Sequence, residues 1–210
     1  MKWPISSLSG VAVILLYCTF TFTSWALYPP PYSPVTNWLS DLGNSTYNPT
    51  GAIIYNLGCI FTGITLFPFF IGMYKWYTTE KWRKAALFIT QAIGGTAAFA
   101  LIMIGVFSED AGYLHSLWSD IFFLLNLVVL ILADLSLVSH PCHIKAIAGY
   151  AFAVVIINLM FVFASNTPLL EWFTVFTALG YVGLLSYNTT RIRSALKVHA
   201  RAWPDLRQSE

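Results

Sequence analysis

Acidic side chains gather on one side of the apolar segments of this chain, where the sequence offers no basic residue to pair with them. If the long apolar runs are membrane spans, the acids on that side, or in the adjacent half of a span, are Asp41, Glu109, Asp110, Asp120 and Glu171. His115 is the one histidine on the same side. Carboxylates and an imidazole together can bind a divalent cation or act as general acid and base. We therefore expect functional chemistry at this end of the spans.

Asp120 is the most informative of these acids. It lies about four residues inside a predicted span at 116–138, which is about 6 Å deep at 1.5 Å per residue. A carboxylate at the membrane centre costs about 2.5–3.5 kcal/mol on insertion scales, and less near the interface. Ser116 is one turn above Asp120, and His115 and Ser119 form a neighbouring i, i+4 pair. The spacing predicts a polar pocket here, and the competing interpretation is an interfacial carboxylate satisfied by water and backbone donors.

Motifs of the common enzyme classes do not occur in the sequence. There is no H-E-x-x-H, no G-x-S-x-G and no phosphate-binding P-loop. His140, Cys142 and His143 lie close together, but a zinc site usually needs four ligands and no second pair is evident. The sequence leaves open whether the protein is an enzyme, and it identifies neither a metal nor a cofactor.

Six long apolar runs must position these residues. The chain is 57% hydrophobic and 10% charged, whereas a soluble domain usually carries about 25% charged residues. We place the spans near 4–27, 51–74, 85–106, 116–138, 146–164 and 169–190. With helices of about 20 residues, six spans and their loops use up residues 1–190. The sequence therefore predicts an all-α polytopic membrane protein with one transmembrane domain and a tail, 191–210.

The basic residues predict the orientation of these spans. All 11 Lys and Arg residues fall on one side, and the connections at 28–50, 107–115 and 165–169 contain none. Because cytoplasmic loops collect Lys and Arg, we expect both termini in the cytoplasm, in a plasma membrane or endomembrane. The bases are scattered over inner loops, so we expect no nucleic acid as a partner and expect membrane lipids instead. Protein partners stay unknown.

The first outer loop carries the signals of a short surface helix. Ser33 is a suitable N-cap, Pro34 suits the first helical position, and Gly43 is a natural stop. Apolar residues between them follow the spacing i, i+3, i+4, i+7, namely Val35, Trp38, Leu39 and Leu42. We therefore expect a helix in this loop that lies with its apolar face on the outer surface of the bundle.

The tail after the sixth span has a different pattern. Apolar residues and one histidine step by four, three, four and three, at Ile192, Leu196, His199, Trp203 and Leu206. Basic residues occupy the other faces. The pattern predicts a basic amphipathic helix on the inner leaflet, and a frayed solvated tail is the alternative.

Two stretches carry a resemblance to a known family. Residues 38–43 read W-L-S-D-L-G and are followed by Pro49 and by Y-N-L-G at 55–58. Residues 105–110 read G-V-F-S-E-D and are followed by His115. Their order resembles the two signatures of the domain of unknown function 998 family, with serine in place of the usual proline at position 108. The same order is similar to eukaryotic damage-regulated autophagy modulator and glycosylphosphatidylinositol-remodelling membrane proteins.

The resemblance implies a six-helix membrane protein whose better-known relatives act on or around membrane lipids. Position by position, it assigns motif roles to Ser40, Asp41, Gly43, Asn56, Gly58, Gly105, Glu109 or Asp110, and His115. Both motifs end at the outer ends of their helices, where the unpaired acids also lie. The two arguments therefore point to the same end of the bundle.

We expect the helix of the first loop to fold over the outer ends of the second to fourth spans. We expect Asp41 to meet Asn56, His115 and Asp120 there, with Glu109 or Asp110 at the rim. The candidate catalytic residues are Asp41, His115 and Asp120. The candidate ligand-binding residues are Ser40, Asn56, Glu109, Asp110, Ser116 and Ser119. A carboxylate next to a histidine favours its protonated form, and a further carboxylate could recruit a metal.

Three functions remain open at this stage. The first is a membrane protein whose outer pocket binds a lipid or another amphiphile. The second is a membrane-embedded hydrolase that acts on a lipid through an Asp/His site, with or without a metal. The third is a small-solute or proton-coupled transporter, which would need a polar track joining Asp120, Asn126 and Asp134. Apolar residues at 121–125 and 127–133 interrupt that track, so we rank transport last. We expect Asp134 to form an interfacial ion pair with Lys145 or with the basic loop at 81–84.

Overall fold

Six apolar α-helices build the part of the chain that the computed structural model describes, residues 3–206, with side chains described for residues 3–192. They are α1 Ile5–Leu27, α2 Ala52–Gly72, α3 Lys81–Val106, α4 Tyr113–Leu137, α5 Lys145–Leu159 and α6 Pro168–Leu206. Short helices extend or link them: η1 Ser40–Gly43, η2 Met73–Trp76, η3 Glu109–Ala111 and the π-helical η4 Met160–Ala164. Residues 3–206 contain no strand. The predicted all-α, six-helix architecture is confirmed.

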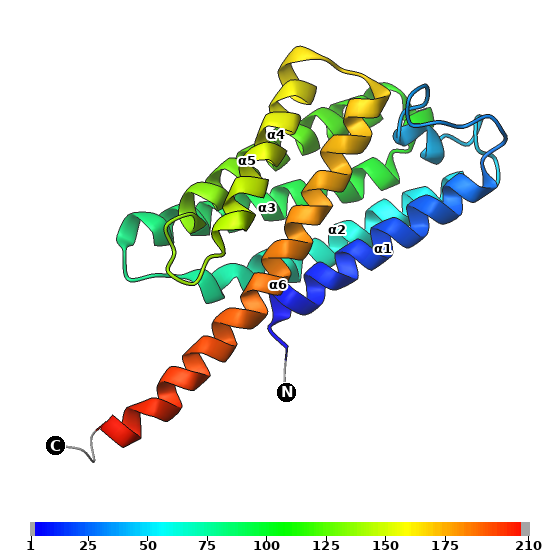
Figure 1. Ribbon diagram of the computed structural model, residues 1–210. Helices are drawn as coiled ribbons and strands as arrows, with labels where there is room; N and C mark the ends of the chain where they lie inside the picture. Colours follow the sequence, from blue (N-terminus) through cyan, green and yellow to red (C-terminus); the bar gives the residue numbers. More distant parts are fainter. Residues whose placement is uncertain (1–2, 207–210) are drawn as a thin grey trace.

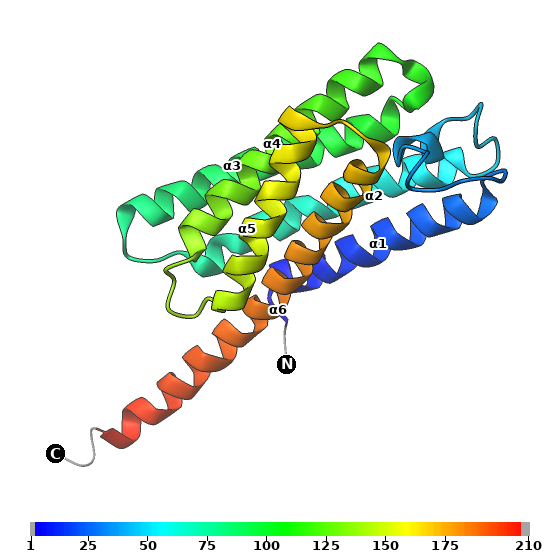
Figure 2. The ribbon, with the colours of Figure 1, turned by 45° about the horizontal axis from the view of Figure 1, so that its top comes forward.

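The helices pack mainly in chain order, as Figures 1 and 2 show. α1 contacts α2, α2 contacts α3, and α3 contacts α4, while α6 contacts both α5 and α1. Sequential helices are antiparallel, and their connections are short except for the first loop, residues 28–51. Close approach depends on small residues, as at Gly63, where an added Cβ would lie 2.7 Å from the carbonyl oxygen of Ala98 on α3. Such small residues are typical of helix contacts in membranes, where dispersion contacts rather than water exclusion hold helices together.

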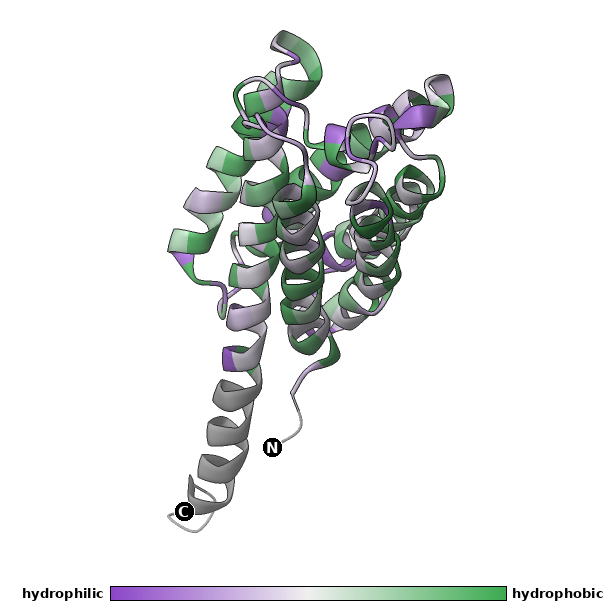
Figure 3. Cartoon of the chain, turned by 90° about the vertical axis from the view of Figure 1, so that its right-hand side faces the viewer, coloured by the Kyte–Doolittle hydropathy of each residue, from purple (hydrophilic) through white to green (hydrophobic). Residues whose placement is uncertain are grey.

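The outside of the bundle is apolar. Large hydrophobic side chains such as Ile53, Phe88 and Phe152 are exposed along the helices. Figure 3 shows green residues along the helices of the bundle and purple residues mainly near its ends. Each of the six helices has the length and composition of a membrane span. Because a soluble protein would not present such a surface, the chain is an integral membrane protein.

The outer end of the bundle is defined here by residues 28–51, 107–112 and 165–167. These observed connections correspond to those predicted to face outward, at 28–50, 107–115 and 165–169. A buried apolar cluster at this end includes Tyr17 of α1, Tyr55 of α2 and Trp172 of α6. Leu39 and Leu42 of the first loop belong to the same cluster and are 1% and 0% exposed. The first loop is therefore part of the core and cannot move without disturbing three helices.

The helix predicted in the first loop is shorter than expected. Residues 34–37 form a turn, and only Ser40–Gly43 is helical, as a 3₁₀ turn. Asp41 Oδ2 accepts hydrogen bonds from the backbone N–H of Trp38 at 3.1 Å and from Asn37 Nδ2 at 3.2 Å. Such side-chain bonds compete with helical backbone bonds, which explains the break. Of the predicted apolar face, Leu39 and Leu42 point inward while Val35 is 65% exposed.

Two predictions concern the inner end of the bundle: an ion pair of Asp134, and an amphipathic helix in the tail. Lys145 Nζ donates to the carbonyl oxygen of Val138 at 2.7 Å, and Arg83 pairs with Glu80 at 3.1 Å. Within the side chains described, Asp134 has no ion pair, so its predicted structural role in one is wrong. The helix α6 continues to Leu206, but the side chains that would form the amphipathic face of the tail lie outside the described residues from position 193 onward.

Candidate functional site

A buried polar network fixes the first loop on the outer ends of α1 and α2. Ser24 Oγ donates to the carbonyl oxygen of Leu42 at 3.2 Å, and Asn48 Nδ2 donates to the same oxygen at 2.9 Å. Both side chains are fully buried. Asn56 of α2 donates through Nδ2 to the carbonyl oxygen of Gly43 at 3.0 Å, and a side chain at Gly43 would clash with Asn56. The family-like residues Gly43 and Asn56 therefore hold the loop in place.

Two carboxylates from other elements hold the loop from its other side. Glu171, in the first turn of α6, accepts a hydrogen bond at 2.6 Å from the backbone N–H of Leu39. Glu109 of η3 accepts one at 3.4 Å from Ser40 Oγ. Asp41 and Glu171 are both buried. These acids are close enough to repel one another, because the charges of Asp41 and Glu109 both act on the Glu171 carboxyl group.

The electrostatics of this cluster are clearest at Glu109, which lies in a connection outside the spans. Burial, followed by the negative charge of Asp41, raises the pKa of Glu109 from 4.5 to about 7. Within residues 3–192, no Lys or Arg forms an ion pair with these carboxylates. The cluster therefore holds a proton near neutral pH that a bound cation could replace.

His115 is buried at this end, with 7% of its surface exposed. Its Nδ1 lies 2.8 Å from the carbonyl oxygen of Phe107. A carbonyl oxygen can only accept, so Nδ1 carries the proton and Nε2 of the neutral ring is left as an acceptor. Among the side chains described, His115 has no hydrogen bond to Asp41 or to Asp120, so the predicted direct contact is not formed.

A cavity of about 630 Å³ opens at the outer end beside α4. Six predicted site residues lie in its wall: Ser40, Glu109, His115, Ser116, Ser119 and Asp120. Its apolar wall consists of Trp38, Phe123, Leu124, Phe161, Val162 and Phe163. Neither Lys nor Arg belongs to the wall that the structure describes. We call this space the outer cavity.

The other three predicted site residues lie outside this wall. Asp41 turns into its own loop, and Asn56 binds Gly43. Asp110 accepts hydrogen bonds from the backbone N–H of Ser45 at 2.9 Å and from its hydroxyl at 3.0 Å. These bonds lower the pKa of Asp110. All three residues hold the first loop in its conformation or position, and the structure brings none of them to the cavity surface.

Glu171 was missing from the predicted site although it lies in the wall of the outer cavity. The sequence counted it among the unpaired outer acids, and its signal was the same as that of Asp120. It lies three residues after Pro168, inside an apolar helix, where a carboxylate also favours the positive end of the helix dipole. Glu171 and Leu39 are separated by 132 residues in the sequence, so no local pattern predicts their contact.

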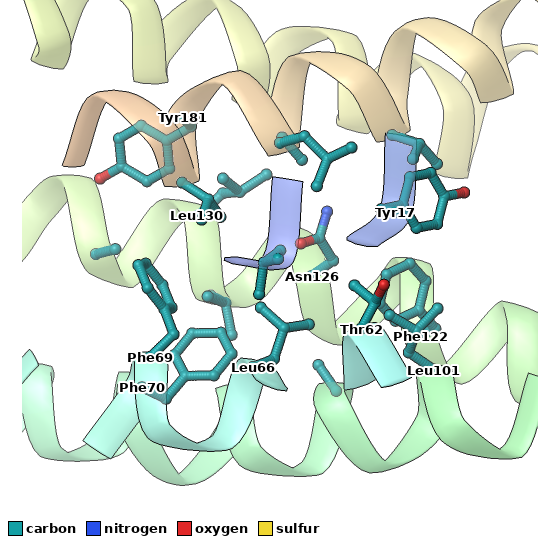
Figure 4. A pocket seen from close by; sticks show the side chains of 18 of the residues that line it. Tyr17, Thr62, Leu66, Phe69, Phe70, Leu101, Phe122, Asn126, Leu130 and Tyr181 are labelled. Carbon is teal, nitrogen blue, oxygen red and sulfur yellow. The ribbon is translucent and has the colours of Figure 1, made fainter. Parts of the chain in front are cut away.

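Two smaller cavities adjoin the outer cavity and extend toward the centre of the bundle. A narrow space of about 20 Å³, called the neck, shares Ser40, Ser119 and Glu171 with the outer cavity. A space of about 90 Å³, called the central cavity, shares Tyr17, Leu101, Phe122, Phe123 and Val175 with the neck. Figure 4 shows the central cavity, with Asn126 and Thr62 among mostly apolar side chains.

No group of three or more His, Cys, Asp or Glu side chains within the described residues is arranged to hold a metal ion. The predicted cluster of Asp41, His115 and Asp120 is thus not assembled as a set of metal ligands. The inner residues His140 and His143 pack instead against the ring of Trp76, at centroid distances of 5.2 and 5.7 Å.

A comparison with known families identifies the chain. The family model described as Protein of unknown function (DUF998) matches residues 11–188. The chain belongs to this family. No curated protein and no solved structure matches it. The DUF998 match covers most of each of the six spans, as well as the three connections that contribute to the outer cavity. The more distant similarity to autophagy-modulator and lipid-remodelling proteins stays a prediction.

Proposed function

We propose that this DUF998 protein binds an amphiphile in the outer cavity, with the polar head among the carboxylates and hydroxyls and the apolar part along the aromatic wall. The observation that carries the proposal is the composition of that wall. Ligand cavities are typically about 300–1,000 Å³, mostly apolar, with a few convergent polar groups. The outer cavity, of about 630 Å³, has this size and composition.

The charge of the wall supports a cationic head rather than an anionic one. Glu109, Asp120 and Glu171 lie in the wall, and the wall that the structure describes includes no Lys or Arg. An anionic head would meet like charges without compensation, whereas an amine would replace the proton that Glu109 holds near pH 7. An amine-bearing amphiphile is therefore the expected ligand class.

One observation favours a lipid hydrolase as the second candidate. The ring of His115 is fixed by the bond of Nδ1 to Phe107, and the residue lies in the wall of the same cavity. A positioned neutral imidazole can serve as a general base. Transport has less support, because the central cavity below is lined mainly by apolar side chains.

Uptake of simple amphiphiles by the protein in lipid nanodiscs tests the proposal. The probes share a dodecyl chain and differ in the head: dodecyltrimethylammonium, dodecylphosphocholine and dodecyl sulfate. Equilibrium dialysis would measure the probe bound in excess of that in empty nanodiscs. We expect saturable binding that is strongest for the ammonium probe.

An occluding variant provides the control. Ser119→Phe places a ring in the outer cavity and should abolish the saturable part of the binding. The control variant Leu117→Phe also introduces a phenylalanine, but on the exposed side of α4, and should leave binding intact. Equal uptake by the wild type and Ser119→Phe, or uptake that follows the lipid content alone, would refute the proposal.

A further inference from the structure

We infer that the ligand's tail enters the helix bundle through the neck and ends in the central cavity, and that the protein therefore selects a single linear alkyl chain. The inference rests on the proposed function, because it concerns the other end of the same ligand. It replaces the simpler arrangement in which the tail stays outside the protein, among the lipids.

The first argument is that the three cavities adjoin one another in series. Ser119 and Glu171 belong to both the outer cavity and the neck, and Tyr17 and Phe122 belong to both the neck and the central cavity. Phe123 of α4 belongs to all three. An alkyl chain that starts beside the acidic head site would therefore need to displace only shared side chains such as Phe123 to reach the centre of the bundle.

The length of that series matches a lipid tail. Along α4 the cavities run from His115 to Ala133, which is 18 residues, or about 27 Å at 1.5 Å per residue. The hydrocarbon core of a bilayer is about 30 Å thick. The central cavity alone follows α4 from Phe122 to Ala133, or about 16 Å. In length, the series of cavities therefore matches one extended chain.

The width of the path decides which kind of tail fits. The central cavity has about 90 Å³ distributed along that length. An engineered protein cavity of about 150 Å³ accepts one benzene ring. A smaller volume spread over several helical turns is slender, so it suits a linear chain and excludes a fused ring system or two chains side by side.

The wall of the central cavity also contains a polar group without a hydrogen-bond partner. Thr62 is 1% exposed, and its Oγ1 has no hydrogen-bond partner among the residues described. Figure 4 shows Thr62 beside Phe122 and Leu101, the residues at the neck end of this cavity. A buried hydroxyl without a partner costs free energy, so an occupant with one polar atom near the head end of its chain would satisfy it.

Photo-crosslinking of a chain-labelled probe tests where the tail lies. The probe is dodecyltrimethylammonium with a diazirine on the terminal carbon, bound to the full-length protein in nanodiscs and mapped by mass spectrometry. We expect adducts on side chains of the central cavity, such as Leu130, Ala133 and Met73. Adducts confined to lipid-facing residues such as Phe88 and Phe152 would overturn the inference while leaving the proposed function standing.

Filling the cavity supplies a second and independent measurement. Ala133→Leu, or Ala97→Leu if the first variant does not fold, shortens the central cavity, and Ala92→Leu makes the same change on the exposed face of α3. Binding of alkyltrimethylammonium probes from octyl to hexadecyl should peak at a shorter chain in the filled variant only. An unchanged chain-length profile in the filled variant would overturn the inference. If the wild type bound none of the probes saturably, the proposed function itself would be wrong.

Discussion

The backbone N–H of Leu39 donates a hydrogen bond to the carboxylate of Glu171 at 2.6 Å, and so joins the first outer loop to the first turn of α6. Both residues are buried. Since a backbone N–H in an apolar setting needs an acceptor, the position of the loop on the bundle depends on α6. The outer cavity is thus a product of the whole fold, assembled from the first loop, η3, α4, η4 and α6.

Replacement of Glu171 should separate its structural role from its charge. Glu171→Ala leaves the Leu39 N–H buried without an acceptor, which costs about 1–3 kcal/mol. Glu171→Gln keeps an acceptor oxygen and should cost clearly less. Hydrogen exchange at Leu39, measured by mass spectrometry, should be much faster in the alanine variant than in the glutamine variant. Equal exchange in both variants would show that the carboxylate does not hold the loop.

The raised pKa of Glu109 predicts a pH dependence of ligand binding. With a pKa of about 7, Glu109 is largely protonated one unit below and largely charged one unit above that value. Affinity for the dodecyltrimethylammonium probe should therefore rise as the pH rises through about 7. Glu109→Gln should flatten this profile and reduce affinity on the alkaline side. Asp41, Asp120, Glu171 and His115 also face this region, so a step that persists in Glu109→Gln would assign the titration to one of them.

The same shift has the opposite effect on stability. The folded pKa of Glu109 lies above its ordinary value of 4.5, so the folded protein holds this proton more tightly than the unfolded chain. The stabilisation is complete below pH 4.5 and is lost as the pH rises through about 7. The loop should therefore be less protected from proteolysis in alkaline buffer without ligand, and a bound cation should reverse this trend.

Much of the architecture could be predicted because its signals are local. Apolar runs of about 20 residues mark the six spans. Helical spacing places His115, Ser116, Ser119 and Asp120 on neighbouring positions of α4, and all four lie in the wall of the outer cavity. The role of Asp41 was not predictable in this way, because its carboxylate turns back to the N–H of Trp38 in an irregular loop. Contacts that join distant segments, such as that of Leu39 with Glu171, leave no periodic pattern in the sequence and could not be predicted from it.

Membrane orientation is still a prediction from the basic residues, and cysteine labelling can test it. In a variant without the three native cysteines, cysteines at the exposed positions Thr46 and Thr167 should react with an impermeant reagent added to the outside of intact cells. A cysteine at Thr79, also exposed, should react only after the membrane is opened. Labelling of position 79 from outside would reverse the orientation, and the outer cavity would then face the cytoplasm.

Asp120 and Asp134 lie on the same helix and should respond differently to the same change. Asp120 is exposed in the wall of the outer cavity, so Asp120→Asn should weaken binding of the dodecyltrimethylammonium probe with a change in stability within about 0.5 kcal/mol. Asp134 lies near the inner end, outside the walls of the three cavities, and its Oδ1 is buried without a hydrogen-bond partner. Asp134→Asn removes an uncompensated charge and should raise thermal stability, with probe binding unchanged.

Thermal unfolding and dialysis binding measured on both variants in the same nanodiscs would decide the matter. The two substitutions are chemically identical, so differences between them report on position alone. If Asp120→Asn bound the ammonium probe as well as the wild type did, the carboxylate would not contact the head, and the acidic wall would be reduced to Glu109 and Glu171. If Asp134→Asn lost binding as well, the polar groups along α4 would be coupled across the membrane. That result would favour transport in spite of the apolar central cavity.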